Sequence, residues 1–372
     1  MSSTGTAITI NISPGQFIAT PTSFNTPLVV TRETATLANG QNFQVISSLS
    51  QLTALDTTNV YKMVRDILSS TPKVSNVGVL VLAPGDDVGD ELTALLGTDW
   101  YHILYANSAE TANELSDIKN ISDFAQANMK QFFVALTGTA TAASAIISDS
   151  SNANSIIGNN RTLALFHQDI TEHIEAPWVS RVMSYPEVGR EGFAPARSGT
   201  NFAGKTPDTF SLTKSQDIEM KNGNMYIQEG GLNFIDHSYM LNDFSLSLET
   251  TAQQVLQRDW IVANTRSTIR TFFQSSRVPR YTDADIVMLG TLLKDRVFDV
   301  AGARGFIDGI TTSDQAAAST SALYRYNLRL PTRAEVERTA PQNIKTGLLS
   351  GVQLDYYEAG FFDKVQINIS YL

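Results

Sequence analysis

Apolar runs of strand length alternate with helix-like segments in the first half of the chain, and this alternation restricts the fold most. Val77–Ala83 contains only apolar residues and one glycine, which is typical of a strand covered on both faces of a sheet. Phe132–Leu136 and Thr162–Phe166 are similar, and Asn59–Ser69 has the apolar stripe of an amphipathic helix. Strands that alternate with helices predict an α/β sheet.

The other elements expected in this half follow the same two patterns. A turn at Gly230-Gly231 between two short apolar runs predicts a β-hairpin. The expected elements are strands at Leu28–Thr31 and Tyr101–Tyr105, helices that begin at Leu92 and Glu110, an alanine-rich helix between Leu136 and Thr162, and hairpin strands at Met225–Ile227 and Leu232–Ile235.

Two long helices are expected in the second half. Ala252–Ser276 has apolar residues on one stripe at spacings of seven and four, namely Val255, Val262, Ile269 and Phe273. Asp283–Ala303 is expected to be a helix that begins after Thr282 as its N-cap and ends near Gly305. Strands are expected at Leu323–Leu330 and Val352–Tyr357.

These patterns divide the chain into segments. The divisions fall where prolines and glycines cluster or where the periodicity changes. The segments are an N-terminal linker arm (1–20), an α/β domain (21–245) with a loop-rich stretch (185–225), an α+β domain with two long helices and a small sheet (246–360), and a closing strand (361–372).

Two segments near the ends of the sequence alternate apolar and polar residues with the period of a strand. The apolar positions are Ile8, Ile10 and Ile12 in the first segment, and Val365, Ile367, Ile369 and Tyr371 in the second. A strand with one apolar face needs a sheet to join. Two arrangements stay open: each strand completes a sheet of its own chain, or it adds to a sheet of a neighbouring subunit.

The composition excludes several classes of function. The net charge is −10, whereas a protein that binds nucleic acid through its phosphates normally carries a basic surface. Because the sequence contains no cysteine, thiol catalysis, disulfides and thiolate metal sites are excluded. No run approaches the length of a membrane span, and the polar first residues predict no secretory signal.

The candidate chemical motifs are weak. The four histidines, His102, His167, His173 and His237, form no i, i+4 pair and no HExxH motif. The acidic group Asp86, Asp87, Asp90 and Glu91 lacks the spacing of an EF-hand loop, so we interpret it as the start of a helix. We also find no phosphate-binding glycine loop. The sequence therefore predicts no catalytic, cofactor-binding or metal site.

The long helix carries the main charge feature of the chain. Between Arg258 and Arg280 the sequence has five arginines and a single acid, Asp259. Arg266, Arg270 and Arg277 are spaced so that they project within about 40° of one another on a helix. This stripe is either a solvated face or a docking face for an acidic partner.

Several motifs, in this order along the chain, resemble contractile tail sheath proteins of phages and phage-derived particles. The resemblance extends over roughly residues 78–372. The motifs are Trp100–Leu136, Trp178-Val179-Ser180-Arg181-Val182, Asn222–Ile227 with Gly230-Gly231, Asp259-Trp260 with Ile269, Phe272 and Phe273, Arg277–Asp283, Ala303–Ile307 and Gly360–Leu372.

The resemblance implies a structural protein of a bacteriophage virion rather than an enzyme. It implies hexameric rings of this chain stacked helically around a tail tube protein, with baseplate and tail terminator proteins at the ends. It also implies terminal strands exchanged between subunits, an inner helical domain facing the tube, and assembly in the host cytoplasm. The alternatives are the sheath of a bacterial secretion or toxin-delivery apparatus and an α/β enzyme with an unrecognised site.

Overall fold

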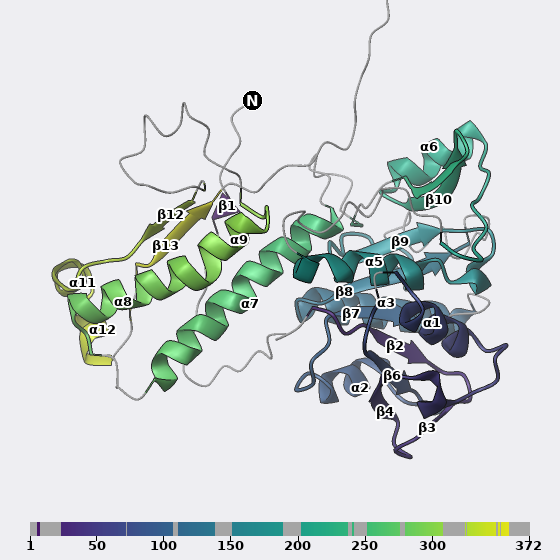
Figure 1. Ribbon diagram of the computed structural model, residues 1–372, viewed down its shortest axis with the longest axis horizontal. Helices are drawn as coiled ribbons and strands as arrows, with labels where there is room; N and C mark the ends of the chain where they lie inside the picture. Colours follow the sequence, from purple (N-terminus) through teal and green to yellow (C-terminus); the bar gives the residue numbers. More distant parts are fainter. Residues whose placement is uncertain are drawn as a thin grey trace, which may run out of the picture. The chain divides into compact units, whose positions relative to one another are not determined.

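The computed structural model describes most of the chain, and the chain divides into two compact units. The described residues are 6–7, 24–71, 73–106, 111–137, 151–188, 202–236, 240–241, 251–275, 280–307, 324, 326–346, 349 and 351–356. The α/β unit comprises Pro21–Val188 and Phe193–Leu256, and the helical unit comprises Met1–Thr20, Gly189–Gly192 and Gln257–Leu372 (Figure 1).

An eight-stranded sheet forms the centre of the α/β unit. Its six inner strands run parallel, and a strand at each edge runs antiparallel to its neighbour. In spatial order the strands are β11 (Leu232–Ile235), β10 (Asn224–Glu229), β9 (Thr162–Phe166), β8 (Gln131–Leu136), β7 (His102–Tyr105), β2 (Leu28–Thr31), β6 (Val77–Val81) and β4 (Phe43–Ile46). The expected α/β sheet is therefore present.

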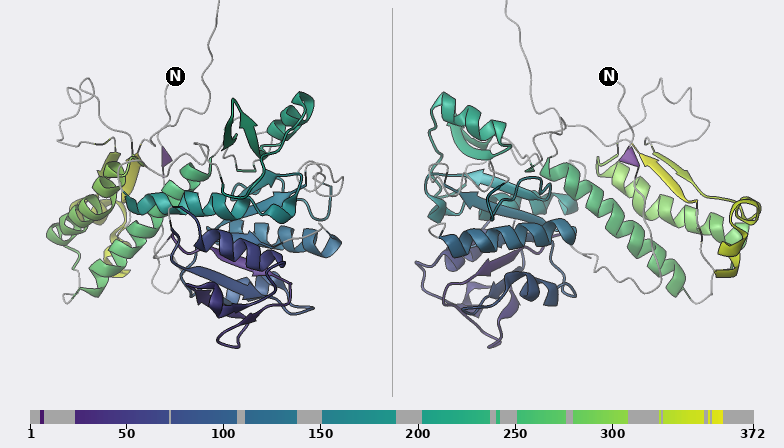
Figure 2. Two further views of the ribbon diagram at one scale, coloured as in Figure 1. Left: turned by 45° about the vertical axis from the view of Figure 1, so that its right-hand side comes forward. Right: turned by 180° about the vertical axis from the view of Figure 1, so that it is seen from behind.

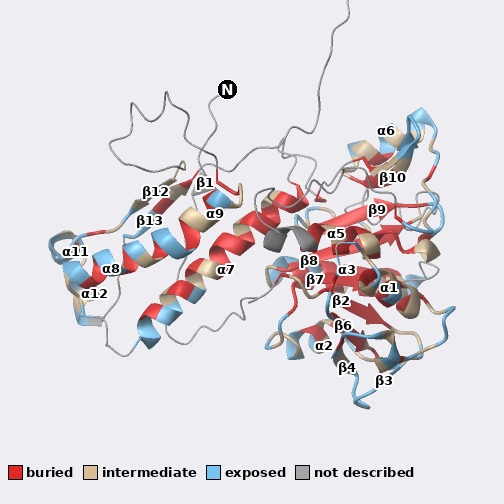
Figure 3. Cartoon of the chain, viewed as in Figure 1, coloured by how far each residue is buried: buried red, intermediate tan, exposed pale blue. Residues whose placement is uncertain are grey.

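Helices cover both faces of this sheet. The helices α1 (Asn59–Leu68) and α5 (Glu175–Val188) pack together on one face, where the ring of Trp178 meets that of Phe133. The helices α2 (Val88–Ala94) and α3 (Ala112–Ala127) pack together on the other face (Figure 2). Since both faces are covered, the central strands are buried along their whole length (Figure 3), as their apolar runs predict.

The segment 185–225 differs from the expectation of loops. In its described part, α5 continues to Val188 and α6 spans Leu212–Met220. Ser211 caps α6 by accepting a hydrogen bond from the backbone of Lys214, and Ile218 is buried beneath the helix. No element was expected between β2 and α1. There the structure adds β4 and the short elements β3 (Thr36–Leu37), η1 (Leu49–Gln51) and β5 (Leu52–Thr53).

Two long helices form the core of the helical unit. The helix α7 (Ala252–Gln274) has its first residues in the α/β unit, up to Leu256. The second helix consists of α8 (Asp283–Leu293), the π-helical turn η3 (Lys294–Phe298) and α9 (Asp299–Ala303). Near the end of this helix Phe306 packs edge-to-face on Trp260 of α7.

The caps of the second helix confirm the sequence signals. The side chain of Thr282 accepts a hydrogen bond from the backbone of Asp285. At the other end Gly305 has a φ of +75°, and the backbone N–H of Phe306 reaches the carbonyl of Ala301, which is a Schellman ending.

The apolar stripe of α7 is only partly buried, because Val255 and Val262 are buried whereas Phe273 is 58% exposed.

A three-stranded antiparallel sheet, the small sheet, lies against the second helix. Its order is β1 (Thr6–Ala7), β13 (Gln353–Tyr356) and β12 (Tyr326–Arg329). The short helices α11 (Arg333–Thr339) and α12 (Pro341–Thr346) connect β12 to β13. In the register of the sheet, Tyr326 pairs with Tyr356 and Leu328 with Leu354, so these apolar side chains share one face.

Glycines let the chain around β12 approach the second helix closely. A Cβ atom added at Gly302 would lie 2.2 Å from the ring of Tyr324, and one added at Gly290 would lie 2.3 Å from Leu330. Real Cβ contacts are not that short, so any larger residue at these positions must displace the chain before or after β12.

We expect Gly302→Ala to destabilise the helical unit by about 1–3 kcal/mol, because the added methyl group collides with Tyr324. Urea unfolding followed by circular dichroism measures the change. Gly97→Ala is the matched control, since nothing lies within 4 Å of a Cβ atom there. Equal free energies of unfolding for the two variants would show that the close contact between Gly302 and Tyr324 does not contribute to stability.

Candidate functional site

The place where sheets of this topology bind ligands is filled by the chain itself. The strands β6, β2, β7, β8 and β9 follow the doubly wound order, which reverses between β2 and β7. In such sheets ligands bind outside the carboxyl ends of the strands at this reversal. Here Arg32, which follows β2, makes a two-pronged ion pair with Asp117 of α3, with bonds of 2.5 and 2.9 Å.

Further contacts hold this ion pair in place. The guanidinium of Arg32 also donates to the backbone carbonyls of Ala83 and Asp86, beyond the end of β6. The hydroxyl of Tyr105, the last residue of β7, donates to Asp117 at 2.7 Å. Burial, together with this carboxylate, raises the pKa of Tyr105, so the hydroxyl stays protonated and keeps donating. The described residues at the reversal thus tie β2, β6, β7 and α3 together.

The acidic group after β6 starts a helix, as the sequence analysis expected. Asp87 is the N-cap of α2 and accepts from the backbone of Gly89 and Asp90. Asp86 accepts from the backbone of Ala83, and Glu91 accepts from the side chain of Asn42. Among the described residues no three His, Cys, Asp or Glu side chains gather in a way that could hold a metal ion.

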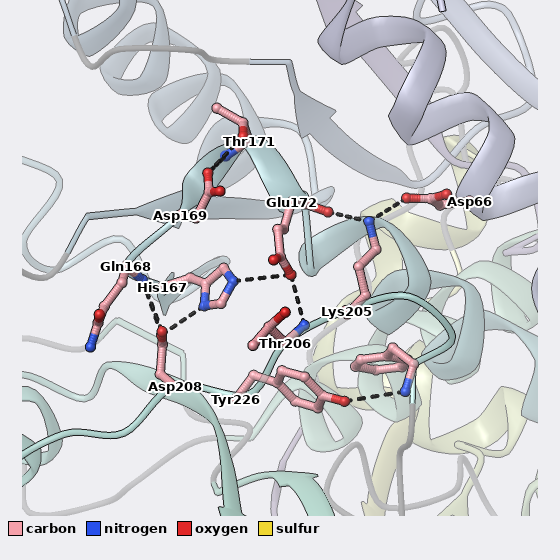
Figure 4. A network of polar contacts seen from close by, with 11 residues as sticks. Asp66, His167, Gln168, Asp169, Thr171, Glu172, Lys205, Thr206, Asp208 and Tyr226 are labelled. Atoms are coloured by element: carbon pink, nitrogen blue, oxygen red, sulfur yellow. Dashed lines mark hydrogen bonds and ion pairs between the residues drawn. The ribbon is translucent and has the colours of Figure 1, made fainter. Parts of the chain in front are cut away.

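A second polar cluster, the His167 cluster, lies beyond the carboxyl end of β9 (Figure 4). The Nδ1 atom of His167 lies 2.7 Å from Asp208, and its Nε2 atom lies 3.6 Å from Glu172. Asp208 also accepts from the backbone of Gln168 at 3.0 Å, and Glu172 accepts from the backbone of Thr206 at 2.8 Å. The imidazole is therefore held between two carboxylates from separate segments.

Lys205 extends this cluster to the helix α1. Its ammonium contacts Asp66 of α1 at 2.5 Å and also donates to the backbone carbonyl of Glu172. The side chains of Lys205 and Asp66 are only 6% and 11% exposed, so the pair is largely shielded from water. The cluster thus fastens the segment 202–208 both to the loop after β9 and to α1.

The surroundings of His167 suit a residue that holds segments of the chain together rather than a catalytic residue. Its side chain is 2% exposed, and each ring nitrogen faces a carboxylate, so neither nitrogen is open to a substrate. Burial alone would lower the pKa of His167, but the hydrogen bond and charge of Asp208, with the charge of Glu172, outweigh burial and raise it. The two carboxylates therefore favour the charged form of the imidazole.

The other histidines are also internal. His102 is fully buried, and burial, helped by the charge of Lys130, lowers its pKa to about 3. His173 is buried next to Glu175, with 3.0 Å between Nδ1 and the carboxylate. His237 lies outside the described residues.

The arginine stripe is described only in part. Arg266 and Arg270 lie one turn apart on α7, where Arg266 is half-buried and Arg270 is exposed. Burial lowers the pKa of Arg266, and the charge of Asp259 opposes this shift. Arg277 lies outside the described residues. Arg270 therefore presents its charge to solvent more fully than Arg266 does.

The strand residues expected to join neighbouring subunits also lie outside the described part, namely Ile8, Ile10, Ile12, Val365, Ile367, Ile369 and Tyr371. The two residues just before Ile8 are described: Thr6 pairs with Tyr356 and Ala7 with Asp355 of the same chain. No helix in the described ranges has both the length and the apolar character needed to cross a membrane.

Sequence reasoning missed both polar clusters. His167 and Asp208 are 41 residues apart, and Arg32 and Asp117 are 85 apart, so no local motif joins either pair. A signal was available for the close packing of the small sheet, since an isolated glycine inside a helical pattern, as at Gly290 and Gly302, indicates a packing constraint.

We expect His167→Gln to destabilise the α/β unit in a pH-dependent way. The folded pKa of His167 is raised, so its stabilisation is complete below the unfolded pKa of about 6.5 and is lost as the pH rises through the folded pKa. The substitution should cost about 1–3 kcal/mol near pH 6 and less near pH 9. Urea unfolding followed by the fluorescence of Trp100 and Trp178 measures this difference.

His102→Gln is the control for this experiment. Because burial lowers the pKa of His102 to about 3, this residue is neutral in the folded chain but takes up a proton near pH 6 in the unfolded chain, whose pKa is about 6.5. The loss of stability on its substitution should therefore be smaller near pH 6 than near pH 9, which is the opposite of the trend expected for His167→Gln. If His167→Gln lowers the free energy of unfolding as much near pH 9 as near pH 6, the charge of His167 does not stabilise the fold.

Comparisons with known proteins identify the fold. No protein-family model matches the chain, and no curated protein matches it. Solved structures do match. A chain in the six-fold symmetrised cryo-EM structure of the anti-feeding prophage baseplate has a TM-score of 0.64 at 10% identity, over 100% of this chain and 99% of that one.

Two further matches are to sheath proteins. The helical sheath of the anti-feeding prophage in its contracted state has a TM-score of 0.64 at 11% identity, over 97% of this chain and 98% of that one. The crystal structure of the sheath tail protein from Desulfitobacterium hafniense has a TM-score of 0.53 at 7% identity, over 87% and 93%. The chain therefore has the fold of contractile tail sheath proteins, as the order of its motifs indicated.

Proposed function

We propose that this chain is the sheath subunit of a contractile injection machine. Its copies form hexameric rings that stack helically around a tail tube, and contraction of the stack drives the tube through the envelope of a target cell. The observation that carries this proposal is the match to the contracted helical sheath over 97% of this chain and 98% of that one.

The small sheet supports assembly by strand exchange. In the single chain β1 pairs with β13 through Thr6 and Ala7, and the same hydrogen bonds form equally well with a second copy, as in domain swapping. Within the described residues β12 pairs only with β13, so its outer edge is available to the strand of Val365, Ile367, Ile369 and Tyr371 from another subunit. Ile8, Ile10 and Ile12 then extend the N-terminal pairing.

The distribution of charge supports an inner role for the helical unit. The sequence of the helical unit contains 15 Lys and Arg against 13 Asp and Glu, whereas that of the α/β unit contains 12 against 24. An acidic tube would attract the helical unit and repel the α/β unit. Arg266, Arg270 and Arg277 of α7 are the proposed tube-facing residues, and Arg270 is the most accessible of those described.

The polar clusters of the α/β unit support a structural rather than a catalytic role. Both the strand reversal and the carboxyl end of β9 are occupied by contacts that tie segments of the chain together. The proposed partners are further copies of the chain, the tube protein, and the baseplate and terminator proteins. The proposed location is the tail of a virion, assembled in the host cytoplasm.

A second candidate shares this mechanism but differs in the particle. Two of the three solved structures described above come from the anti-feeding prophage, one of them in its baseplate, which supports a prophage-derived delivery particle as the alternative to a phage virion. Electron micrographs of the native particle separate the two, because only the virion carries a capsid on its tail.

We expect the purified chain to form long hollow tubes, and the strand residues to be needed for them. Chains that lack residues 1–13 or 363–372 should stay folded and monomeric, because several backbone hydrogen bonds of about 1 kcal/mol each are lost at every subunit contact. Negative-stain electron microscopy and sedimentation measure assembly, and circular dichroism measures folding.

The two faces of the C-terminal strand provide a matched control for this experiment. Substitution of Ile367→Ser with Ile369→Ser should abolish tubes, whereas Gln366→Ser with Asn368→Ser should leave them intact. Unfolding of the truncated chains would show instead that the strands complete the core of their own subunit.

We expect Arg270→Glu to spare folding but impair extended tails, which should appear as bare tubes or as sheaths already contracted. Each exposed ion pair contributes only about 0–1 kcal/mol, but the loss repeats at every subunit. Particle micrographs measure the outcome. Lys73→Glu makes the same charge change at an exposed position of the α/β unit and should be neutral, so normal extended tails from Arg270→Glu would contradict the tube contact.

A further inference from the structure

The two edge strands of the eight-stranded sheet lack the features that normally keep a sheet edge from pairing. Among the described strands β4 is bonded only to β6, and β11 only to β10, so each has one side without a partner strand. Proteins usually protect such edges with charged residues or proline. Neither β4 nor β11 contains a charged residue or a proline. Both edges are therefore suited to contact with another chain.

The surface around β4, which we call the β4 end, is uncharged well beyond the strand itself. Residues 34–55 form β3, β4, η1 and β5 and contain no Asp, Glu, Lys, Arg or His. Most of these residues are exposed, and two of the exposed ones are large and apolar, Val45 at 43% and Leu55 at 72%. The cores of protein–protein interfaces are depleted of charged residues in the same way.

The opposite end of the sheet, the β11 end, has a similar character. It consists of β11 and of α6, which lies near the hairpin of β10 and β11 (Figures 1 and 2). Leu212 and Met220 of α6 are 75% and 69% exposed, and Leu232 of β11 is 67% exposed. The residue that caps α6, Lys221, forms an ion pair with Asp217 at 2.8 Å, so these two charges compensate each other.

The helix α6 is weakly anchored in the single chain. It has nine residues, of which only Ile218 is buried. Helices this short are marginal in water and depend on packing against other elements. Leu212 and Met220 contribute nothing to such packing while they are exposed. Contact with a partner at the β11 end would therefore stabilise α6.

The two ends together hold all the large apolar side chains that the α/β unit exposes within its described ranges. Six strands lie between β4 and β11, and at a spacing of about 4.8 Å this separates the two edges by about 34 Å. One chain cannot bury its β4 end against its own β11 end. Burial of either end therefore requires another molecule.

The charge of the α/β unit favours a second copy of this chain as that molecule. The sequence of the unit contains 12 Lys and Arg against 24 Asp and Glu, so two such units repel each other over much of their surfaces. At the β4 end no charge opposes the approach. Contact between unlike ends buries both free edges at once, and such a head-to-tail contact repeats into rings or helices.

We propose that the β4 end of one copy docks on the β11 end of another copy, so that the α/β units of the assembly contact each other directly. The setting of this contact rests on the proposed function, which brings many copies together in a helical stack. The docking adds a second kind of contact to the strand pairing of the helical unit, and it requires no change within the subunit.

Cross-linking tests this contact, because the natural chain contains no cysteine. Leu55→Cys and Leu232→Cys are introduced singly and together, and tubes of each variant, both extended and contracted, are treated with a short bis-maleimide. The double variant should give a ladder of dimers, trimers and longer species on a denaturing gel. Each single variant should stay monomeric, and an equal mixture of the two single variants should stop at dimers.

The matched control combines Leu232→Cys with Gln126→Cys, which places the second cysteine at an exposed position of α3, away from both edge strands, and should give no ladder. Absence of a ladder from the Leu55→Cys and Leu232→Cys double variant in both kinds of tube would overturn the proposal. Dimers from either single variant alone would also overturn it, because they would show that like ends meet.

The second readout is the concentration at which tubes form. Leu55→Glu adds a charge to the β4 end and should raise this concentration at least about tenfold relative to Leu55→Gln, while circular dichroism shows both variants folded. Equal concentrations for the two variants would overturn the proposal. If the natural chain forms no tubes, the proposed sheath function fails, and the same cross-linking of the concentrated soluble chain decides whether the two ends meet.

Discussion

Backbone pairing along β13 is the interaction on which the helical unit and the proposed assembly depend. On one side β13 holds four residues of β12, and on the other it holds two residues of β1. An isolated pair of strands is marginally stable in water. The small sheet persists because the second helix supports it through Gly290 and Gly302. A sheet of this kind gains most from additional strands, which makes strand exchange between copies the natural way to extend it.

The α/β unit contributes rigidity rather than chemistry in this account. Arg32 with Asp117 ties three strands to α3, and His167 with its two carboxylates ties the segment 202–208 to the sheet. Both clusters lie beyond the carboxyl ends of strands, and the Arg32 pair stands at the strand reversal where related sheets bind ligands. Contraction by rotation of whole units requires bodies that do not deform themselves, so internal clamps at these positions are consistent with a structural subunit.

The sequence predicts the elements whose signals are local. Val77–Ala83 is apolar because its strand is covered on both faces, and Gly230 and Gly231 both have the positive φ of a tight hairpin turn. The helix α6 was missed because its short sequence has little periodicity and only Ile218 is buried. The His167–Asp208 contact and the hydrogen bond from Tyr326 to Asp299 each join residues distant in sequence, so no local pattern predicts them. Spacing identified Arg266 and Arg270 as neighbours but could not show that Arg266 is half-buried.

In the proposed assembly, subunits are joined by strands that complete one another's small sheets. A cryo-EM helical reconstruction of the assembled chain, at a resolution that traces the backbone, tests this most directly. We expect six subunits in each ring, with the strand of Ile367 and Ile369 from one subunit beside β12 of another. A tube in which every small sheet contains strands of a single chain would contradict it.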